Sequence, residues 1–251
     1  MNAIIEGFQN MVDGFADAVF LALIKEDRYQ FLVQGLGRSL LLTVIAALIG
    51  VTIGLLLAVA KLQDVNNLTG NRFVVWLRKM VAGFANGYIA VVRGTPAVVQ
   101  LMVIYFIIFG RMFKGIPLPD YIIAAIAFGI NSGAYVAEII RAGILAVDRG
   151  QTEAGRSLGL SGTQTMAHIV IPQAVKNVLP ALGNEFIVLL KETSVAGYIG
   201  IADLTKGAQS IGSVTYDYIV PLLCAAFIYF LMTTALSTVL GKQERRMRRS
   251  D

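Results

Sequence analysis

Polar and ionisable side chains recur inside long apolar stretches of this chain, often at helical spacing. The set comprises Gln100, Asn131, Tyr135, Glu138, Asn184, Glu185, Lys191 and Glu192. Within it, Asn131, Tyr135 and Glu138 stand at i, i+4 and i+7, so a helix presents them on one face. A charge at the centre of a bilayer costs on the order of 3 kcal/mol on insertion scales, so such groups are expected to face a protein interior. Their chemistry is hydrogen bonding and charge pairing, which suits a pathway for a polar solute.

Internal pairing is an equally good interpretation of any single residue of this set. Glu138 and Arg141, for example, stand at i and i+3 and can form an ion pair on one helix. Taken together, the polar stripes favour a transporter or channel over a membrane scaffold that transports nothing.

Catalytic and metal chemistry find little support in the sequence. Cys224 is the only cysteine and His168 the only histidine, which excludes a disulfide within the chain and a metal site built on cysteine pairs. The phosphate loop GxxxxGK[ST] is absent, since Gly241 and Lys242 lack the upstream glycine. We expect a chain that is not an enzyme, with any ATP hydrolysis supplied by another subunit.

The elements that position these residues are predicted to be membrane-spanning helices. The chain is 56% hydrophobic and 15% charged. Residues 39–60 carry no charge and, at about 1.5 Å per residue, can cross a hydrocarbon core of about 30 Å. The sequence predicts an all-α integral membrane protein with about five transmembrane helices, at residues 39–60, 96–109, 121–137, 179–199 and 218–240.

The basic residues predict the orientation. An odd number of spans puts the two termini on opposite sides, and residues 61–93, 138–178 and 241–251 then share one side. These segments hold most of the 21 lysines and arginines, so that side is predicted to be cytoplasmic. The N-terminus is expected outside, with an amphipathic helix over residues 1–30, and residues 242–251 form a basic cytoplasmic tail. The net charge of +5 therefore indicates topology, and no nucleic acid partner is expected.

Small residues at every fourth position predict how two spans pack, because close packing in lipid relies on them. One stripe is Ala46, Gly50, Gly54 and Ala58, and the other is Ala125, Gly129, Gly133 and Ala137.

The polar stretch EAGRSLGLSGTQTMAHIVIP, residues 153–172, lies between predicted spans. Asp148 with Gln151 is a variant capping box, Gly159 is a helix stop, and Ser161 with Gln164 is a second box. These signals predict two short helices joined at Gly159, where glycine permits a turn and a close approach. The first helix has too little apolar surface to be stable alone, so we expect it to dock on another protein.

This stretch resembles the cytoplasmic EAA loop of permease subunits in binding-protein-dependent ATP-binding-cassette importers. The matching positions are Glu153, Ala154, Gly159, Ile169 and Pro172, while Gly155 stands in place of an alanine and Ile171 in place of a leucine. The stretches RGTPAVVQL, NSGAYVAEIIRAGI and LPALGNEFIVLLKETS are similar to the permeases of polar amino acid importers. The resemblance implies a type I permease domain over about residues 35–241.

The resemblance implies an ATP-driven amino acid importer in the bacterial cytoplasmic membrane. Its partners are two ATPase subunits that bind ATP and Mg²⁺, a second permease subunit, and an extracytoplasmic binding protein. In this chain Glu153, Ala154, Gly155 and Gly159 would couple to the ATPase, while Ile169 and Pro172 fix the return into the membrane. The second permease is either another copy or a related chain, and the amino acid carried is not identified. The alternative is a secondary transporter driven by an ion gradient, which would not need the EAA-like loop.

Overall fold

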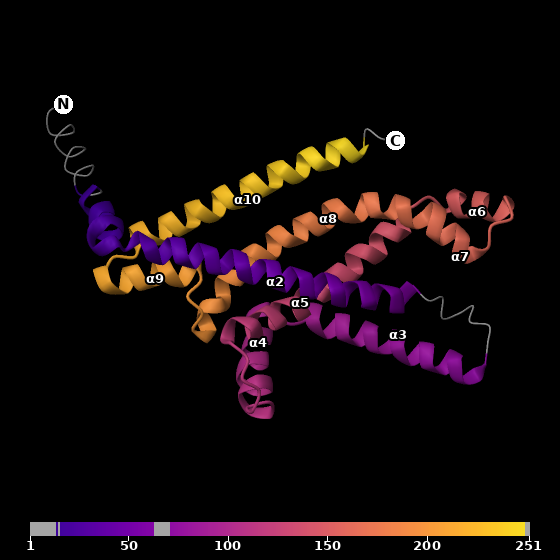
Figure 1. Ribbon diagram of the computed structural model, residues 1–251, viewed down its shortest axis with the longest axis horizontal. Coiled ribbons are helices and arrows are strands. Elements are labelled where there is room, and N and C mark those ends of the chain that lie inside the picture. The colour runs from indigo at the N-terminus through magenta and orange to yellow at the C-terminus, as the bar shows by residue number, and fades with distance from the viewer. Residues whose placement is uncertain (1–13, 15, 63–70, 249–251) are drawn as a thin grey trace. The chain divides into compact units, whose positions relative to one another are not determined.

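The computed structural model describes residues 14, 16–62 and 71–248, and all its regular elements in these ranges are helices (Figure 1). The predicted all-α class is therefore confirmed. Three of the described helices are long and apolar enough to cross a membrane, Tyr29–Lys61, Asp120–Leu145 and Ile219–Met247. A fourth candidate is the pair Arg72–Arg93 and Ala97–Met112, which is bent by 109°. The exact number of spans stays a prediction.

Two compact units make up the chain, and each is described by itself. The first comprises Met1–Leu41 and Thr193–Thr234, and the second comprises Leu42–Glu192 and Ala235–Asp251. Two long helices, α2 (Tyr29–Leu62) and α10 (Ile219–Arg248), run through both units.

Close backbone contact holds the first unit together. Its helix α9 (Leu204–Thr215) lies against the first turns of α2, and glycines make that approach possible. A Cβ at Gly35 would lie 2.6 Å from the carbonyl oxygen of Asp203, and one at Gly207 would lie 2.5 Å from that of Phe31. The residues buried around this contact are Ala22, Leu32, Leu204, Ala208, Ile211, Val220 and Ala225.

Asp203 begins α9 as its N-cap residue. Its Oδ1 accepts a hydrogen bond from the backbone N–H of Lys206 at 2.8 Å, while Ser39 Oγ accepts from that of Leu204 at 3.1 Å. Asp203 is completely buried and its Oδ2 has no partner within the described residues. Burial raises the pKa of this carboxyl to about 6, because the charged form is desolvated.

The helix expected over residues 1–30 is described only in part, since residues 1–13 and 15 lie outside the described residues. The described part includes a π-helical turn, η1 (Phe20–Ile24), and a 3₁₀ turn, η2 (Lys25–Asp27). Glu26 and Asp27 have positive φ, so a single helix does not continue to residue 30. The Arg28 guanidinium donates to the carbonyl oxygen of Leu21 at 2.9 Å and stabilises this break.

The two small-residue stripes pack against each other in the second unit, as their spacing predicts. They lie on α2 and on α5 (Asp120–Leu145). A Cβ at Gly129 would lie 2.6 Å from Ile49, and one at Gly50 would lie 3.0 Å from Ser132. The alanines Ala46, Ala58, Ala125 and Ala137 are completely buried.

Two other helices complete the second unit on α5. One is α3 (Arg72–Arg93), whose Tyr88 hydroxyl donates to the carbonyl oxygen of Ile130. The other is α8 (Ile171–Glu192), whose Asn177 amide donates to the carbonyl oxygen of Gly143 at 3.5 Å. After α3 the chain turns sharply into α4 (Ala97–Met102) and the π-helical segment η3 (Val103–Met112).

Two predicted spans have different ends in the structure. The span at 39–60 begins ten residues earlier as α2, because Arg38 lies within the helix and donates to the carbonyl oxygen of Ala202 at 3.4 Å. The helix at predicted span 179–199 is α8, which begins earlier, at Ile171, and ends earlier, at Glu192, where Thr193–Ile199 forms a 3₁₀ segment, η5. It is not among the described helices that are long and apolar enough to cross a membrane. Spans predicted from uncharged stretches end at the first charged residue, so they omit helical turns whose charged or polar side chains are hydrogen-bonded.

Candidate functional site

The first loop helix, α6 (Arg149–Ser157), begins at its predicted cap. Asp148 Oδ1 accepts a hydrogen bond from the backbone N–H of Gly150 at 2.6 Å. Neither side-chain hydrogen bond of the predicted capping box between Asp148 and Gln151 is present, because the Gln151 N–H donates to the backbone carbonyl of Asp148, so that part of the prediction is wrong. The Gln151 side chain instead accepts a hydrogen bond from Gln173 at 3.3 Å, which ties α6 to α8.

Gly159 ends α6 in a Schellman motif. The backbone N–H of Leu160 binds the carbonyl oxygen of Gly155 at 3.1 Å, and that of Gly159 binds Arg156 at 3.0 Å. Gly159 has φ of +86°, a conformation that side chains disfavour, which confirms the predicted turn. No heavy atom of the described chain lies within 4 Å of a Cβ placed there, so Gly159 makes no close approach to another part of the described chain.

The close approach occurs at Gly155, four residues earlier. Gly155 is buried, and a Cβ there would lie 2.8 Å from Ile169 and 2.8 Å from Thr165. Thr165 is completely buried, so it cannot move aside easily. Gly155 therefore lets α6 pack directly on the second loop helix.

That second helix, α7 (Gly162–Thr165), has both arms of the predicted capping box. Gln164 N–H donates to Ser161 Oγ at 3.2 Å, and Ser161 N–H donates to Gln164 Oε1 at 2.8 Å. The prediction of a short helix is wrong, because α7 continues through a π-helical turn, η4 (Met166–Val170), into α8. Pro172 lies inside this continuous helix, where the preceding π-turn accommodates its missing N–H.

The outer face of α6 is open. Glu153 and Ala154 are exposed, and Leu158 is 82% exposed. Ile169 is partly buried beneath α6, and Pro172 is exposed on α8. Figure 1 shows α6 and α7 side by side, beyond the end of α5 and before the start of α8. The loop thus presents one small, rigid helix whose inner face is packed and whose outer face is available.

Two further predicted residues, Gln100 on α4 and Asn131 on α5, meet beside the turn between α3 and α4. Gln100 Nε2 donates to the carbonyl oxygens of Val92 at 2.7 Å and Thr95 at 3.0 Å, which fixes the orientation of its amide. Its Oε1 then accepts from Asn131 Nδ2 at 3.0 Å. Asn131 is only 3% exposed, and its Oδ1 has no partner within the described residues. A buried acceptor is left available for a ligand or a water.

Glu138 is the centre of an ion-pair network. Its Oε1 accepts from Lys61 Nζ at 2.5 Å, and its Oε2 accepts from Arg141 at 3.1 Å. Arg93 lies 3.9 Å from Oε2 and stacks over the Tyr135 ring, with its guanidinium carbon 5.5 Å from the ring centroid. The predicted pair of Glu138 with Arg141 is therefore present, together with two cations that the sequence did not indicate.

The predicted residues on α8 are less closely grouped. Glu185 Oε1 accepts a hydrogen bond from Ser132 on α5 at 2.8 Å. Asn184 and Lys191 are exposed and Glu192 is partly buried. Asn184 has no hydrogen bond within the described residues, and no group of three or more His, Cys, Asp or Glu side chains there could hold a metal ion. The sequence did not point to Ser132, because a serine beside a small-residue stripe has the properties of a packing residue.

Comparison with known proteins identifies the family. Residues 50–249 match the family model of the binding-protein-dependent transport system inner membrane component. The arginine transport system permease protein ArtQ of Bacillus subtilis is 36% identical over 88% of this chain and 94% of that protein. The putative glutamine transport system permease protein GlnP of Rickettsia conorii is 40% identical over 86% of this chain and 93% of that protein.

A solved structure described as an amino acid ABC transporter with histidines is also similar. It matches with a TM-score of 0.78 and 46% identity over 90% of this chain and 98% of that chain. None of these comparisons supports the alternative of an ion-gradient-driven transporter. Together with the apolar helices, they show that this chain is a transport permease and belongs to the family of binding-protein-dependent transport system inner membrane components.

Proposed function

We propose that this chain is the membrane-spanning subunit of an ATP-driven amino acid importer, and that it is coupled to a separate ATPase through α6. The observation that carries the coupling role is the open outer face of α6, with Glu153, Ala154 and Leu158 exposed. A helix of nine residues is stable only through packing, and the inner face of α6 is already packed through Gly155. Its outer face is therefore free for a partner that pushes or pulls the helix as a rigid body.

The amino acid pathway is proposed to pass Asn131. Among the eight predicted pathway residues, Asn131 is buried and retains an unused acceptor, Oδ1. An ammonium or amide N–H of a substrate can satisfy that acceptor, and a buried acceptor discriminates strongly against solutes without a donor. Two of the relatives are named for arginine and glutamine, which supports an amino acid as the substrate class.

The proposed orientation places the C-terminus and the α6 loop in the cytoplasm and the N-terminus outside. Lys61, Arg93 and Glu138 bound the segments that were predicted to be cytoplasmic, and they lie within one ion-pair network. Because these three residues are in contact, the network supports the placement of the helix segments that carry them near the same membrane surface. The proposed complete importer has two ATPases with ATP and Mg²⁺, a second permease, and a binding protein on the outside.

The test of this function is purification of the tagged full chain from its own cells in mild detergent, with the accompanying subunits identified by mass spectrometry. We expect a nucleotide-binding ATPase at one copy per permease chain. The same preparation, placed in vesicles with a binding protein, should take up an amino acid only when ATP is supplied. Recovery of this chain alone, moving amino acids without ATP, would refute the proposal.

Replacement of Asn131 by leucine tests the pathway. We expect Asn131→Leu to raise the amino acid concentration for half-maximal uptake by about tenfold or more, because a buried hydrogen bond to a charged donor is lost. The measurement is ATP-driven uptake against substrate concentration, in vesicles that contain equal amounts of assembled importer.

Asn177→Leu is the matched control for this substitution. Asn177 also donates from its amide to α5, but it is exposed and has no buried unused acceptor. It should leave the half-saturating concentration unchanged. If Asn131→Leu only lowers the amount of assembled importer, and the half-saturating concentration stays the same, Asn131 pairs internally and does not contact substrate.

A further inference from the structure

The middle of α8 and the last turns of α10 form a groove that the proposed transport function does not use. Within the second unit the two helices touch where Gly183 meets Leu240, and a Cβ at Gly183 would collide with the leucine side chain. Beside this contact lies a cavity of about 390 Å³. It is lined by Leu179, Pro180, Leu240, Gln243, Arg246 and Met247.

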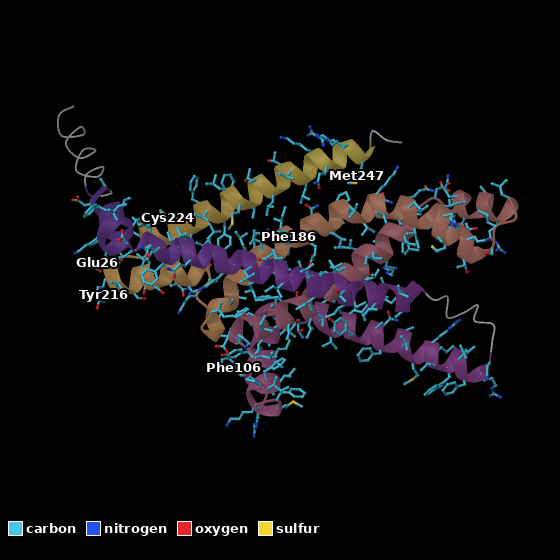
Figure 2. All side chains as sticks on the ribbon, viewed as in Figure 1. Glu26, Phe106, Phe186, Tyr216, Cys224 and Met247 are labelled. Carbon is cyan, nitrogen blue, oxygen red and sulfur yellow. The ribbon has the colours of Figure 1, made fainter. Side chains whose placement is uncertain are left out.

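The groove is apolar inside and polar at its edge. Leu179, Pro180 and Leu240 form apolar walls, and Leu179 is 48% exposed. Gln243 and Arg246 stand on the last turns of α10, near Met247, which Figure 2 labels. Within the described residues the Arg246 guanidinium has no ion pair or hydrogen bond. An unpaired guanidinium beside apolar walls suits a ligand with an anionic head and an apolar chain.

The position of the groove along α10 indicates that it lies at the membrane surface. Helix α10 has 30 residues and is about 45 Å long, which exceeds the hydrocarbon core of about 30 Å. The uncharged residues 219–241 suffice to cross this core, so in the proposed orientation the charged last turns from Lys242 on lie at the level of the cytoplasmic headgroups. Lys242 and Arg245 on the same turns add positive charge, which exceeds the single negative charge of Glu244, itself engaged in an interaction. The cytoplasmic leaflet is the negatively charged one.

We propose that this groove binds one anionic phospholipid of the cytoplasmic leaflet. An acyl chain lies along Leu179, Pro180 and Leu240, and the phosphate accepts hydrogen bonds from Arg246. A guanidinium can bind a phosphate through two N–H groups, whereas a neutral groove would not distinguish lipid headgroups. The inference rests on the proposed orientation, in which the C-terminus is cytoplasmic.

Lipid retention by the purified protein tests this site. The full chain, with whatever subunits accompany it, is reconstituted with phosphatidylglycerol and phosphatidylcholine in equal amounts, washed in detergent, and analysed by native mass spectrometry. We expect the natural protein to retain phosphatidylglycerol selectively and Arg246→Gln to retain about tenfold less. Arg245→Gln is the matched control, since it removes the same charge from the adjacent position, and Arg245 does not line the groove. It should retain lipid like the natural protein.

Several results would overturn the lipid site. Equal losses in the two variants would mean that only the overall charge of the tail matters, and equal retention of the two lipids would remove the anionic preference. A photoreactive amino acid in place of Leu179 distinguishes the occupants. An adduct with lipid supports the proposal, and one with a second permease copy or another protein overturns it.

ATP-driven uptake is measured on vesicles from the same reconstitutions, before the detergent wash. In the natural protein, normal ATP-driven uptake without selective retention of phosphatidylglycerol refutes the lipid site alone. Normal retention without ATP-driven uptake in the natural protein refutes the transport function alone.

Discussion

Replacement of Gly159 by valine is expected to abolish ATP-driven uptake while the chain stays inserted in the membrane. The cost lies in the backbone, because φ of +86° disfavours any residue with a Cβ, and most of all a β-branched one. Steric collision has no part in it, since no atom lies within 4 Å of the new Cβ. The strain is relieved when the Schellman turn opens and α6 rotates away from α7.

The loss of uptake follows from the proposed role of α6. A partner that engages Glu153 and Ala154 requires α6 at a fixed angle to α8, and the turn at Gly159 determines that angle. Insertion depends on the apolar spans and should be unaffected. The measurements are ATP-driven uptake, the amount of chain in the membrane fraction, and the amount of ATPase that co-purifies.

Two further variants show whether backbone conformation is the cause. Gly159→Asn should keep part of the uptake, because asparagine adopts positive φ more readily than other residues with side chains. Gly162→Ala is the matched control, since Gly162 begins α7 with helical conformation and its nearest atom lies 3.8 Å from a new Cβ. Full uptake by Gly159→Val would contradict the coupling role of this turn.

Local signals in the sequence predicted the loop well. The caps at Asp148 and Ser161 and the stop at Gly159 depend on residues within about four positions of each other, so their spacing is sufficient to identify them. The continuity of α7 with α8 could not be predicted. Pro172 and a polar stretch normally indicate a helix end, and only the π-turn at Met166–Val170 allows the helix to continue.

Helix packing was predictable where it depends on small residues, glycine and alanine, that let two helices approach closely. The stripes that include Gly50 and Gly129 could be identified by counting every fourth residue, since two such stripes have few other stable arrangements in lipid. Side-chain pairing was not predictable in the same way. Lys61 and Glu138 are 77 positions apart, and the sequence contains several other cations that could have paired with this glutamate.

Glu138→Gln is expected to destabilise the folded permease by about 3 kcal/mol, which is the cost of removing one partner from a largely buried ion pair. The Lys61 side chain is 16% exposed and that of Glu138 is 20% exposed, so water screens this pair poorly. Arg141 and Arg93 are 40% and 47% exposed, and each of their contacts with Glu138 is worth less than about 1 kcal/mol. The loss of Glu138 leaves three cations close together without a carboxylate.

Removal of both charges should cost less than removal of Glu138 alone. The double variant Lys61→Met, Glu138→Gln leaves no buried ammonium, and methionine fills the space of the lysine stem. Lys61→Met alone should be mild, because Glu138 keeps Arg141 as its partner. Thermal unfolding of the purified chain in detergent, with equal lipid in each sample, gives the order of stability.

The same variants decide between the two interpretations of Glu138 that the sequence left open. A stabilising role predicts low stability for Glu138→Gln, partial recovery in the double variant, and an unchanged half-saturating amino acid concentration for the importer that assembles. A substrate contact predicts normal stability with a raised half-saturating concentration, and Lys61→Met would not restore it. Because Glu138 already has three cations around it, we expect the first result, and the second would return Glu138 to the amino acid pathway.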